Sequence, residues 1–152
     1  MRSTNVYCWA GRGIRWPGAV QACSSGHVSL SVYTVLFAED GKMTLLDAPA
    51  PGADLAGFES FRTEVWGSDA VRALGSRYFP ILASGNLIVP PEEVEDFLRE
   101  CATVRTKLEK IGPHDDLGHS HEWYVETISG RLANIQAAAE RALKAGGGVL
   151  IW

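Results

Sequence analysis

The nine residues 29–37 (SLSVYTVLF) restrict the possible folds of this chain more than any other segment. They are rich in the β-branched and aromatic residues that favour strands. Alternation predicts a strand with both faces covered by other parts of the chain. The two faces carry different sets: Leu30, Val32, Thr34 and Leu36 on one, and Tyr33, Val35 and Phe37 on the other.

A small sheet is predicted to join the two ends of this region. Asp40 and Gly41 tolerate the positive φ angles of a tight hairpin turn, so residues 42–46 are expected to return as a second strand. The last four residues, Val149–Trp152, are apolar and β-favouring, which predicts a buried strand added to that hairpin.

Two long amphipathic helices are predicted to pack on this sheet. The first opens at Pro90-Pro91, and the second runs from about Glu122 to the three glycines at 146–148. Their apolar stripes are Val94, Phe97, Leu98, Cys101, Val104, Leu108 and Ile111 in the first, and Ile128, Leu132, Ile135, Ala139 and Leu143 in the second.

Shorter elements are expected between the hairpin and the first long helix. Asp54 is expected to cap a helix, with Phe58, Phe61 and Trp66 facing the sheet. Leu55 and Val65 are expected on the same helix. A short turn from Ser68-Asp69 to Gly75 and extended pieces at 78–80 and 86–89 should follow. The predicted class is α+β, a small sheet packed against two long amphipathic helices and shorter ones.

The first 27 residues differ from the rest, because they hold four glycines and two tryptophans without a regular period. Arg12, Arg15 and Pro17 interrupt the apolar run that a secretory signal needs. A regular secondary-structure pattern begins at Val28, and a valine codon can start translation in bacteria. Residues 1–27 are therefore predicted to be an irregular extension, either from a misplaced start or a real arm, and residues 28–152 a single α+β domain.

Charge limits the classes of partner. The chain has 18 acidic and 14 basic residues; residues 1–30 contain three arginines and no acid, which leaves a net charge of −7 on residues 31–152. Such a surface disfavours nucleic acid and anionic lipid and favours a basic partner. No apolar run approaches the ~20 residues that span a bilayer. Three cysteines without CxxC spacing fit a reducing cytoplasm.

The sequence contains no motif that dictates a catalytic chemistry. The loop from His114 to Glu122 gathers imidazoles and carboxylates, but its His119-x-His121 spacing matches neither the helical zinc motif nor a closed Cys/His set. A solvated loop or contact surface is favoured over a metal site, and no metal or cofactor is predicted. Cys101 falls on an apolar stripe and is expected to be an inert core thiol.

The body of the chain resembles a family of known proteins. The resemblance lies in SLSVYTVLF, in Phe58-x-x-Phe61-Arg62 followed by VWGS, in FPIL at 79–82, and in an alanine-rich helix leading into GGGVLIW. Over residues 28–152 it resembles small bacterial immunity proteins of polymorphic toxin systems, nearest the Imm70-like group. The resemblance implies a cytoplasmic α+β protein without catalysis, which neutralises a cognate toxin, often a nuclease, by tight binding.

The candidate toxin-binding residues are acidic and come from the net charge of the body rather than from the resemblance. Acids at a helix N-terminus also serve as ordinary capping and solubility devices, so each residue alone has a second interpretation. Two alternative functions stay open, a small regulatory or adaptor module and a metal-dependent enzyme using the loop 114–122. The candidate residues are Glu92, Glu93, Asp115, Asp116 and Glu122.

Overall fold

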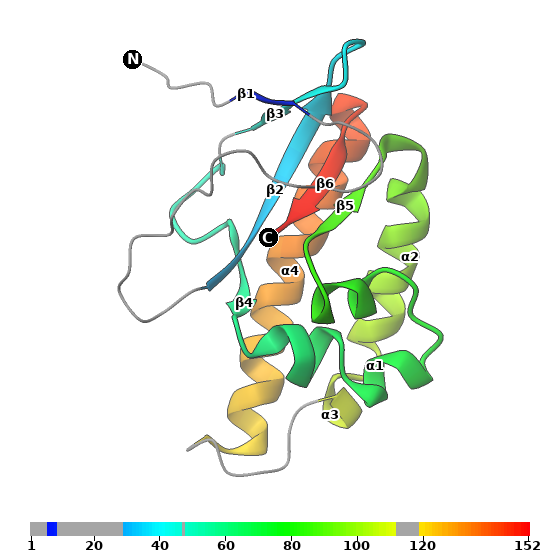
Figure 1. Cartoon of the computed structure of the whole chain (residues 1–152). Helices are drawn as coiled ribbons and strands as arrows, with labels where there is room; N and C mark the ends of the chain where they lie inside the picture. The colour runs from blue at the N-terminus through cyan, green and yellow to red at the C-terminus, as the bar shows by residue number, and fades with distance from the viewer. Residues whose placement is uncertain (1–5, 9–28, 47, 112–118) are drawn as a thin grey trace.

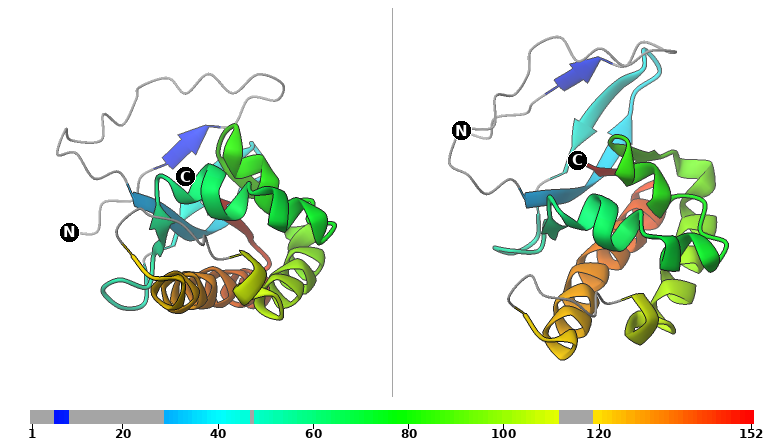
Figure 2. Two further views of the ribbon diagram at one scale, coloured as in Figure 1. Left: turned by 90° about the horizontal axis from the view of Figure 1, so that it is seen from below. Right: turned by 60° about the horizontal axis from the view of Figure 1, so that its bottom comes forward.

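The chain forms an antiparallel sheet with its long helices on one face (Figures 1 and 2). The computed structural model describes residues 6–8, 29–46, 48–111 and 119–152. The sheet order is β1 (Val6–Cys8), β3 (Lys42–Leu45), β2 (Ser29–Phe37), β6 (Gly148–Ile151) and β5 (Leu87–Val89), and β4 (Leu55–Phe58) pairs with the first part of β2. The helices are α1 (Asp69–Ala73), α2 (Val94–Arg105), α3 (Leu108–Ile111) and α4 (His121–Ala145), with shorter turns η1 (Arg62–Trp66), η2 (Phe79–Ala83) and η3 (Pro91–Glu93).

The predicted hairpin and the predicted C-terminal strand are both confirmed. Strand β3 returns antiparallel to β2, with Phe37 opposite Met43. Strand β6 lies between β2 and β5, pairing Thr34 with Val149, and all four of its residues are buried. The chain end is therefore an inner strand of the sheet.

Both faces of β2 are covered, as its alternation predicts. On the face toward the helices, Thr34 donates a hydrogen bond of 2.7 Å from its hydroxyl to the carbonyl of Ala138 in α4. On the other face Val35 is buried in a second apolar cluster. The members of this cluster are Val35, Met43 and Leu150, with Tyr33, Leu45, Ile88 and Trp152 packed against them.

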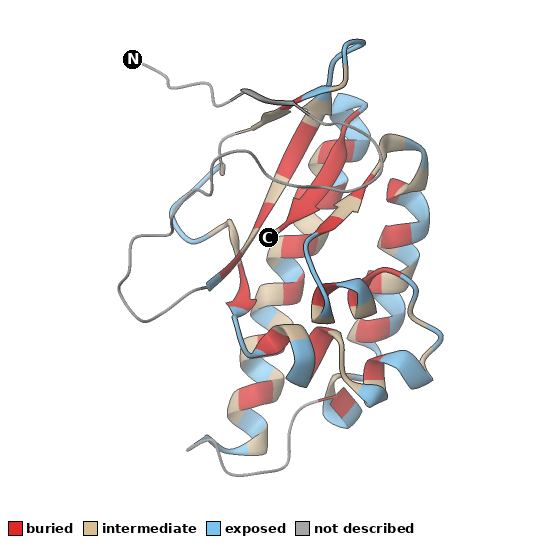
Figure 3. Ribbon diagram, in the orientation of Figure 1, coloured by how far each residue is buried: buried red, intermediate tan, exposed pale blue. Residues whose placement is uncertain are grey.

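The two long helices bury most of the stripes that the spacing predicts, with Leu98 and Leu108 half-buried (Figure 3). Together with the sheet they give the predicted α+β class. Helix α4 is capped by the hydroxyl of Ser120, which accepts from the backbone N–H of Trp123, and it ends at Gly146 with a left-handed φ of 69°. Its predicted stripe is buried as far as Ala139, whereas Leu143 is 47% exposed, so that part of the prediction is wrong.

The predicted helix after Asp54 is wrong. Strand β4 pairs there with β2, and Gly57 adopts a φ of 132°, which a right-handed helix excludes. The single turn η1 follows and buries Trp66, whose indole N–H donates to the carbonyl of Ala56 at 3.1 Å. Phe61 also lies in the core, but Phe58 is 41% exposed and does not face the sheet interior.

Two further boundaries differ from the prediction. The first long helix is interrupted after Arg105, because Lys107 bonds to the carbonyl three residues back, which is the tighter 3₁₀ pattern, before α3 begins. Residues 79–83 form the 3₁₀ turn η2 rather than an extended piece. The short helix α1 begins where the turn at Ser68-Asp69 was predicted, and the hydroxyl of Ser68 caps it by accepting from the N–H of Val71.

Strand β1 places residues 6–8 beside β3, with Val6 opposite Thr44, and the sequence pattern does not predict this strand. The rest of the predicted extension lies outside the described residues, as do Asp115 and Asp116. No helix among the described residues has both the length and the hydropathy needed to cross a bilayer.

Candidate interaction surface

The acidic candidates do not converge on one site. Glu92 belongs to η3, immediately before α2, whereas Glu122 lies in the first turn of α4. The N-termini of α2 and α4 lie toward opposite ends of the molecule (Figure 1). Glu92 and Glu122 therefore belong to separate surfaces.

An apolar groove of about 590 Å³ adjoins Glu92. Strand β5 and the ends of β2, η2 and η3 supply its walls, with Phe37, Ile81 and Ile88 as apolar side chains. Phe37 is 36% and Ile81 45% exposed, and they are two of the four exposed large hydrophobic side chains among the described residues. Among the described residues of the lining, Glu92 is the one that carries a charge. The groove thus offers exposed apolar area beside a carboxylate.

Arg62 fixes the wall formed by the segment between η2 and β5. Its guanidinium donates to the carbonyls of Leu82 at 3.3 Å and Gly85 at 2.8 Å, and to the side-chain oxygen of Asn86 at 3.2 Å. Its Nε also pairs with Glu59 at 2.7 Å. Three of these four acceptors belong to the groove wall, so one planar cation holds the wall through several directed hydrogen bonds. The groove wall is therefore organised before any partner arrives.

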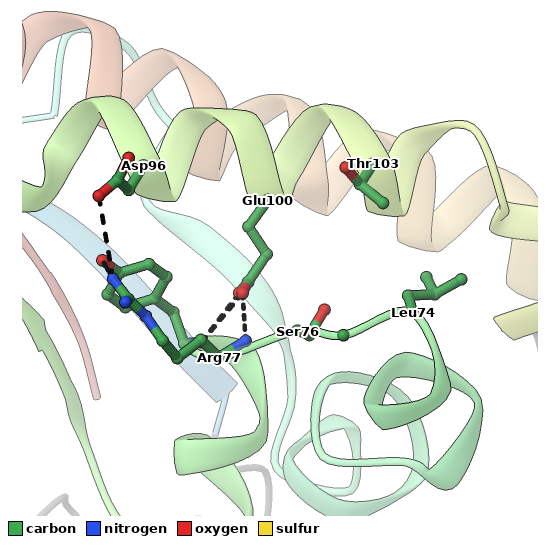
Figure 4. Close-up of a pocket in the computed structure, with 8 residues that line it drawn as sticks. Leu74, Ser76, Arg77, Asp96, Glu100 and Thr103 are labelled. Carbon is green, nitrogen blue, oxygen red and sulfur yellow. Dashed lines mark hydrogen bonds and ion pairs between the residues drawn. The ribbon is translucent and has the colours of Figure 1, made fainter.

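Glu93 is adjacent to Glu92 in sequence but is engaged elsewhere. Its carboxylate accepts from the Tyr78 hydroxyl at 3.3 Å and pairs with Arg77 at 3.4 Å. Arg77 also lies 3.9 Å from Asp96 (Figure 4). Burial raises the pKa of Tyr78 above its usual value, so the phenol keeps its proton and continues to donate. Glu93 therefore supports the local structure.

Glu100 joins α2 to the start of η2. Its carboxylate accepts from the backbone N–H groups of Arg77, Tyr78 and Phe79, the last at 3.0 Å. Figure 4 shows the Glu100 side chain reaching from α2 toward Arg77. These N–H groups open a helical turn and have no partner within it. The contact holds η2, and with it Ile81, against α2.

Glu122 lies beside an aromatic stack at the start of α4. The ring of Trp123 stacks on His119 at a centroid distance of 3.6 Å and on Phe58 at 6.2 Å. Phe58 and His119 are exposed. This second surface combines aromatic rings with one carboxylate.

The described residues include no group of three His, Cys, Asp or Glu side chains placed to hold a metal ion. His114 lies outside them. Cys101 is buried in α2 as predicted, and burial strongly raises the pKa of its thiol. A neutral, enclosed thiol is a poor nucleophile and a poor metal ligand.

Sequence patterns placed Glu92 correctly at the start of a helix but missed the groove beside it. Phe37 and Ile88 belong to strand patterns, and Ile81 to an apolar run of four residues. No local signal marks them as exposed, because the groove forms where four separate elements meet.

Comparison with models of known protein families, with curated proteins and with solved structures finds no match for this chain. The resemblance to immunity proteins therefore stays a prediction.

Proposed function

We propose that this chain is an immunity protein without catalytic activity, which neutralises a basic toxin domain by binding it in the groove between β5 and η2. An apolar side chain of the toxin enters the groove, and a neighbouring lysine or arginine of the toxin pairs with Glu92. The same proposal places the protein in the cytoplasm. The observation that carries it is the exposed apolar groove with a single carboxylate in its lining.

The chemistry of the groove suits a tight protein contact. Binding energy at interfaces concentrates in a few side chains that fill pockets and exclude water. Phe37 and Ile81 provide apolar walls for such an anchor, and their exposed area is removed from water when it binds. A cation beside the anchor pairs with Glu92 where water is excluded, which strengthens the attraction.

The acidic surface supports fast encounter with a basic partner. Residues 31–152 carry a net charge of −7, and Glu92 lies exposed in the groove lining. Complementary charge raises the association rate more than the affinity. The fixed wall around Arg62 adds to affinity, because less conformational freedom is lost on binding.

The adaptor alternative would use the same groove for a different partner. The neighbouring gene separates the two, since immunity predicts a large secreted protein with a variable C-terminal domain encoded immediately upstream. The enzyme alternative depends on the loop 114–122, of which only residues 119–122 are described.

The proposal is tested by co-expression with the toxin domain encoded next to this gene, followed by binding kinetics on the purified pair. Ile81→Asp places a charge in the groove, and Leu143→Asp is its matched control, because Leu143 is exposed to the same degree outside the groove lining. We expect Ile81→Asp to weaken binding at least tenfold, the effect of about 1.4 kcal/mol, and Leu143→Asp to protect like wild type. Failure of the wild type to protect the host, or equal effects of both variants, would contradict the proposal.

A further inference from the structure

We infer that a second pocket, which adjoins the groove at Ile81, binds a carboxylate side chain of the same partner. Its volume is about 540 Å³. Ile81 lines both hollows, so the two sites share one wall. The identity of the partner rests on the proposed function, whereas the carboxylate chemistry rests on this pocket alone. The pocket is lined by Arg72, Ser76, Arg77, Pro80, Ile81 and Ser84.

Arg72 supplies the uncompensated positive charge. It is exposed on α1, and its Nε donates to the carbonyl of Gly67 at 3.3 Å, which fixes the base of the guanidinium. None of the ion pairs among the described residues involves Arg72, whereas Arg62, Arg77 and Arg99 each pair with an acid. Its two terminal nitrogens have no hydrogen-bond partner within the described part of the chain and can donate to both oxygens of a carboxylate.

Three other polar side chains line the pocket beside Arg72, namely Ser76, Arg77 and Ser84. The hydroxyl oxygen of Ser76 is buried and has no hydrogen-bond partner among the described residues. That oxygen is enclosed, and Ser76 also lines a neighbouring hollow with Asp96 and Glu100, so the donors available to an incoming carboxylate are those of Arg72. Arg77 is already paired with Glu93 and Asp96, so its charge is largely balanced while its position helps to shape the pocket.

Among the described residues no acidic side chain lines this pocket, in a chain whose body is strongly acidic. The two neighbouring hollows therefore carry opposite charges: Arg72 lines the pocket, Glu92 lines the groove, and Ile81 lies between them in both linings. A partner that fits both must carry an acid, an apolar anchor and a base in matching positions. A partner in the reverse orientation would bring like charges together, so the pair of sites specifies orientation.

The pocket is tested first without any partner, by NMR titration of the full chain with N-acetyl-glutamate amide and, separately, with inorganic phosphate. We expect the glutamate derivative to shift the Arg72 Nε–H and the backbone amides of Ser76 and Ser84 in a saturable way. Arg72→Gln should abolish these shifts and Glu92→Gln should preserve them. Unchanged shifts in Arg72→Gln, or a saturable response to phosphate alone, would overturn the inference.

The second test uses the toxin domain and two substitutions of equal charge change. Arg72→Glu should weaken binding by about tenfold or more, mainly through faster dissociation, while the exposed control Lys144→Glu stays within about twofold. If Ile81→Asp abolishes binding but Arg72→Glu behaves like Lys144→Glu, this inference is wrong and the proposed function stands. If wild type does not bind the toxin domain, the proposed function fails and the titration alone decides the pocket.

Discussion

Gly148→Ala is expected to destabilise the protein strongly, because Gly148 lies where three strands approach closely. A Cβ built on Gly148 would lie 2.2 Å from the carbonyl oxygen of Val89 and 2.8 Å from the ring of Phe37. Ordinary contacts begin about 1 Å farther away, so either β5 or β6 must move. The oxygen belongs to the backbone, and no side-chain rotation can relieve the clash.

The magnitude follows from these contacts. Forcing an extra methyl group into a closely packed site costs about 1–3 kcal/mol. Displacing β6 from β5 also weakens ladder hydrogen bonds, each contributing about 0.5–1.5 kcal/mol. We therefore expect Gly148→Ala to lower the free energy of unfolding by about 3 kcal/mol, a large fraction of the stability of a small domain.

Chemical denaturation followed by tryptophan fluorescence measures this loss, with Gly130→Ala as the matched control. Gly130 lies inside α4, and a Cβ there meets no atom within 4 Å. Alanine should stabilise that position by up to about 1 kcal/mol through its higher helix propensity. A Gly148→Ala variant within about 0.5 kcal/mol of wild type, the range of ordinary surface substitutions, would refute the placement of β6 between β2 and β5.

Three further predictions concern the helices and the thiol. Phe97→Ala should cost about 3–5 kcal/mol of unfolding free energy because Phe97 is fully buried, while Glu95→Ala should cost less than about 0.5 kcal/mol; equal costs would mean that the wrong face of α2 is buried. Glu100→Gln should lower stability more than Glu95→Gln, since it weakens the bonds to three backbone N–H groups, and equal melting temperatures would contradict this role. Burial raises the pKa of the Cys101 thiol, so in the folded protein it stays protonated, whereas in the unfolded chain cysteine ionises above a pKa of about 8.5. The free energy of unfolding should therefore fall as pH rises above that value, and fall less in Cys101→Ala, as measured by denaturation at increasing pH. The same pH dependence in both proteins would contradict this.

Periodic patterns predicted β2, β3 and β6 as one sheet, β5 as an extended piece, and both long helices, because those elements depend on alternation and helical spacing within one segment; β1 and β4 were not predicted. The predicted helix after Asp54 is wrong for a specific reason. The spacing of Leu55, Phe58, Phe61 and Val65 imitates a helix, but pairing with β2 and the φ of Gly57 decide the structure, and neither is visible in a local window. Long-range pairing overrode a local pattern there.

The candidate surface was less predictable than the fold. Glu92 was found from charge and position, yet its partners in the groove are separated from it in sequence, from Phe37 to Ile88. Exposure of Ile81 depends on Arg62 and Glu100, which fix η2 from two sides. Such contacts arise only when the chain is folded, so composition predicted a basic partner but could not locate the proposed groove.

The most direct test of the central claim is a hydrogen-exchange footprint of the complex with the toxin domain. The groove model predicts slower exchange in residues 81–89 and 92–95 when the toxin is bound, with little change at the start of α4. Protection centred on Glu122 and Trp123 instead, with none around Ile81 and Ile88, would contradict the claim that the toxin docks in the groove.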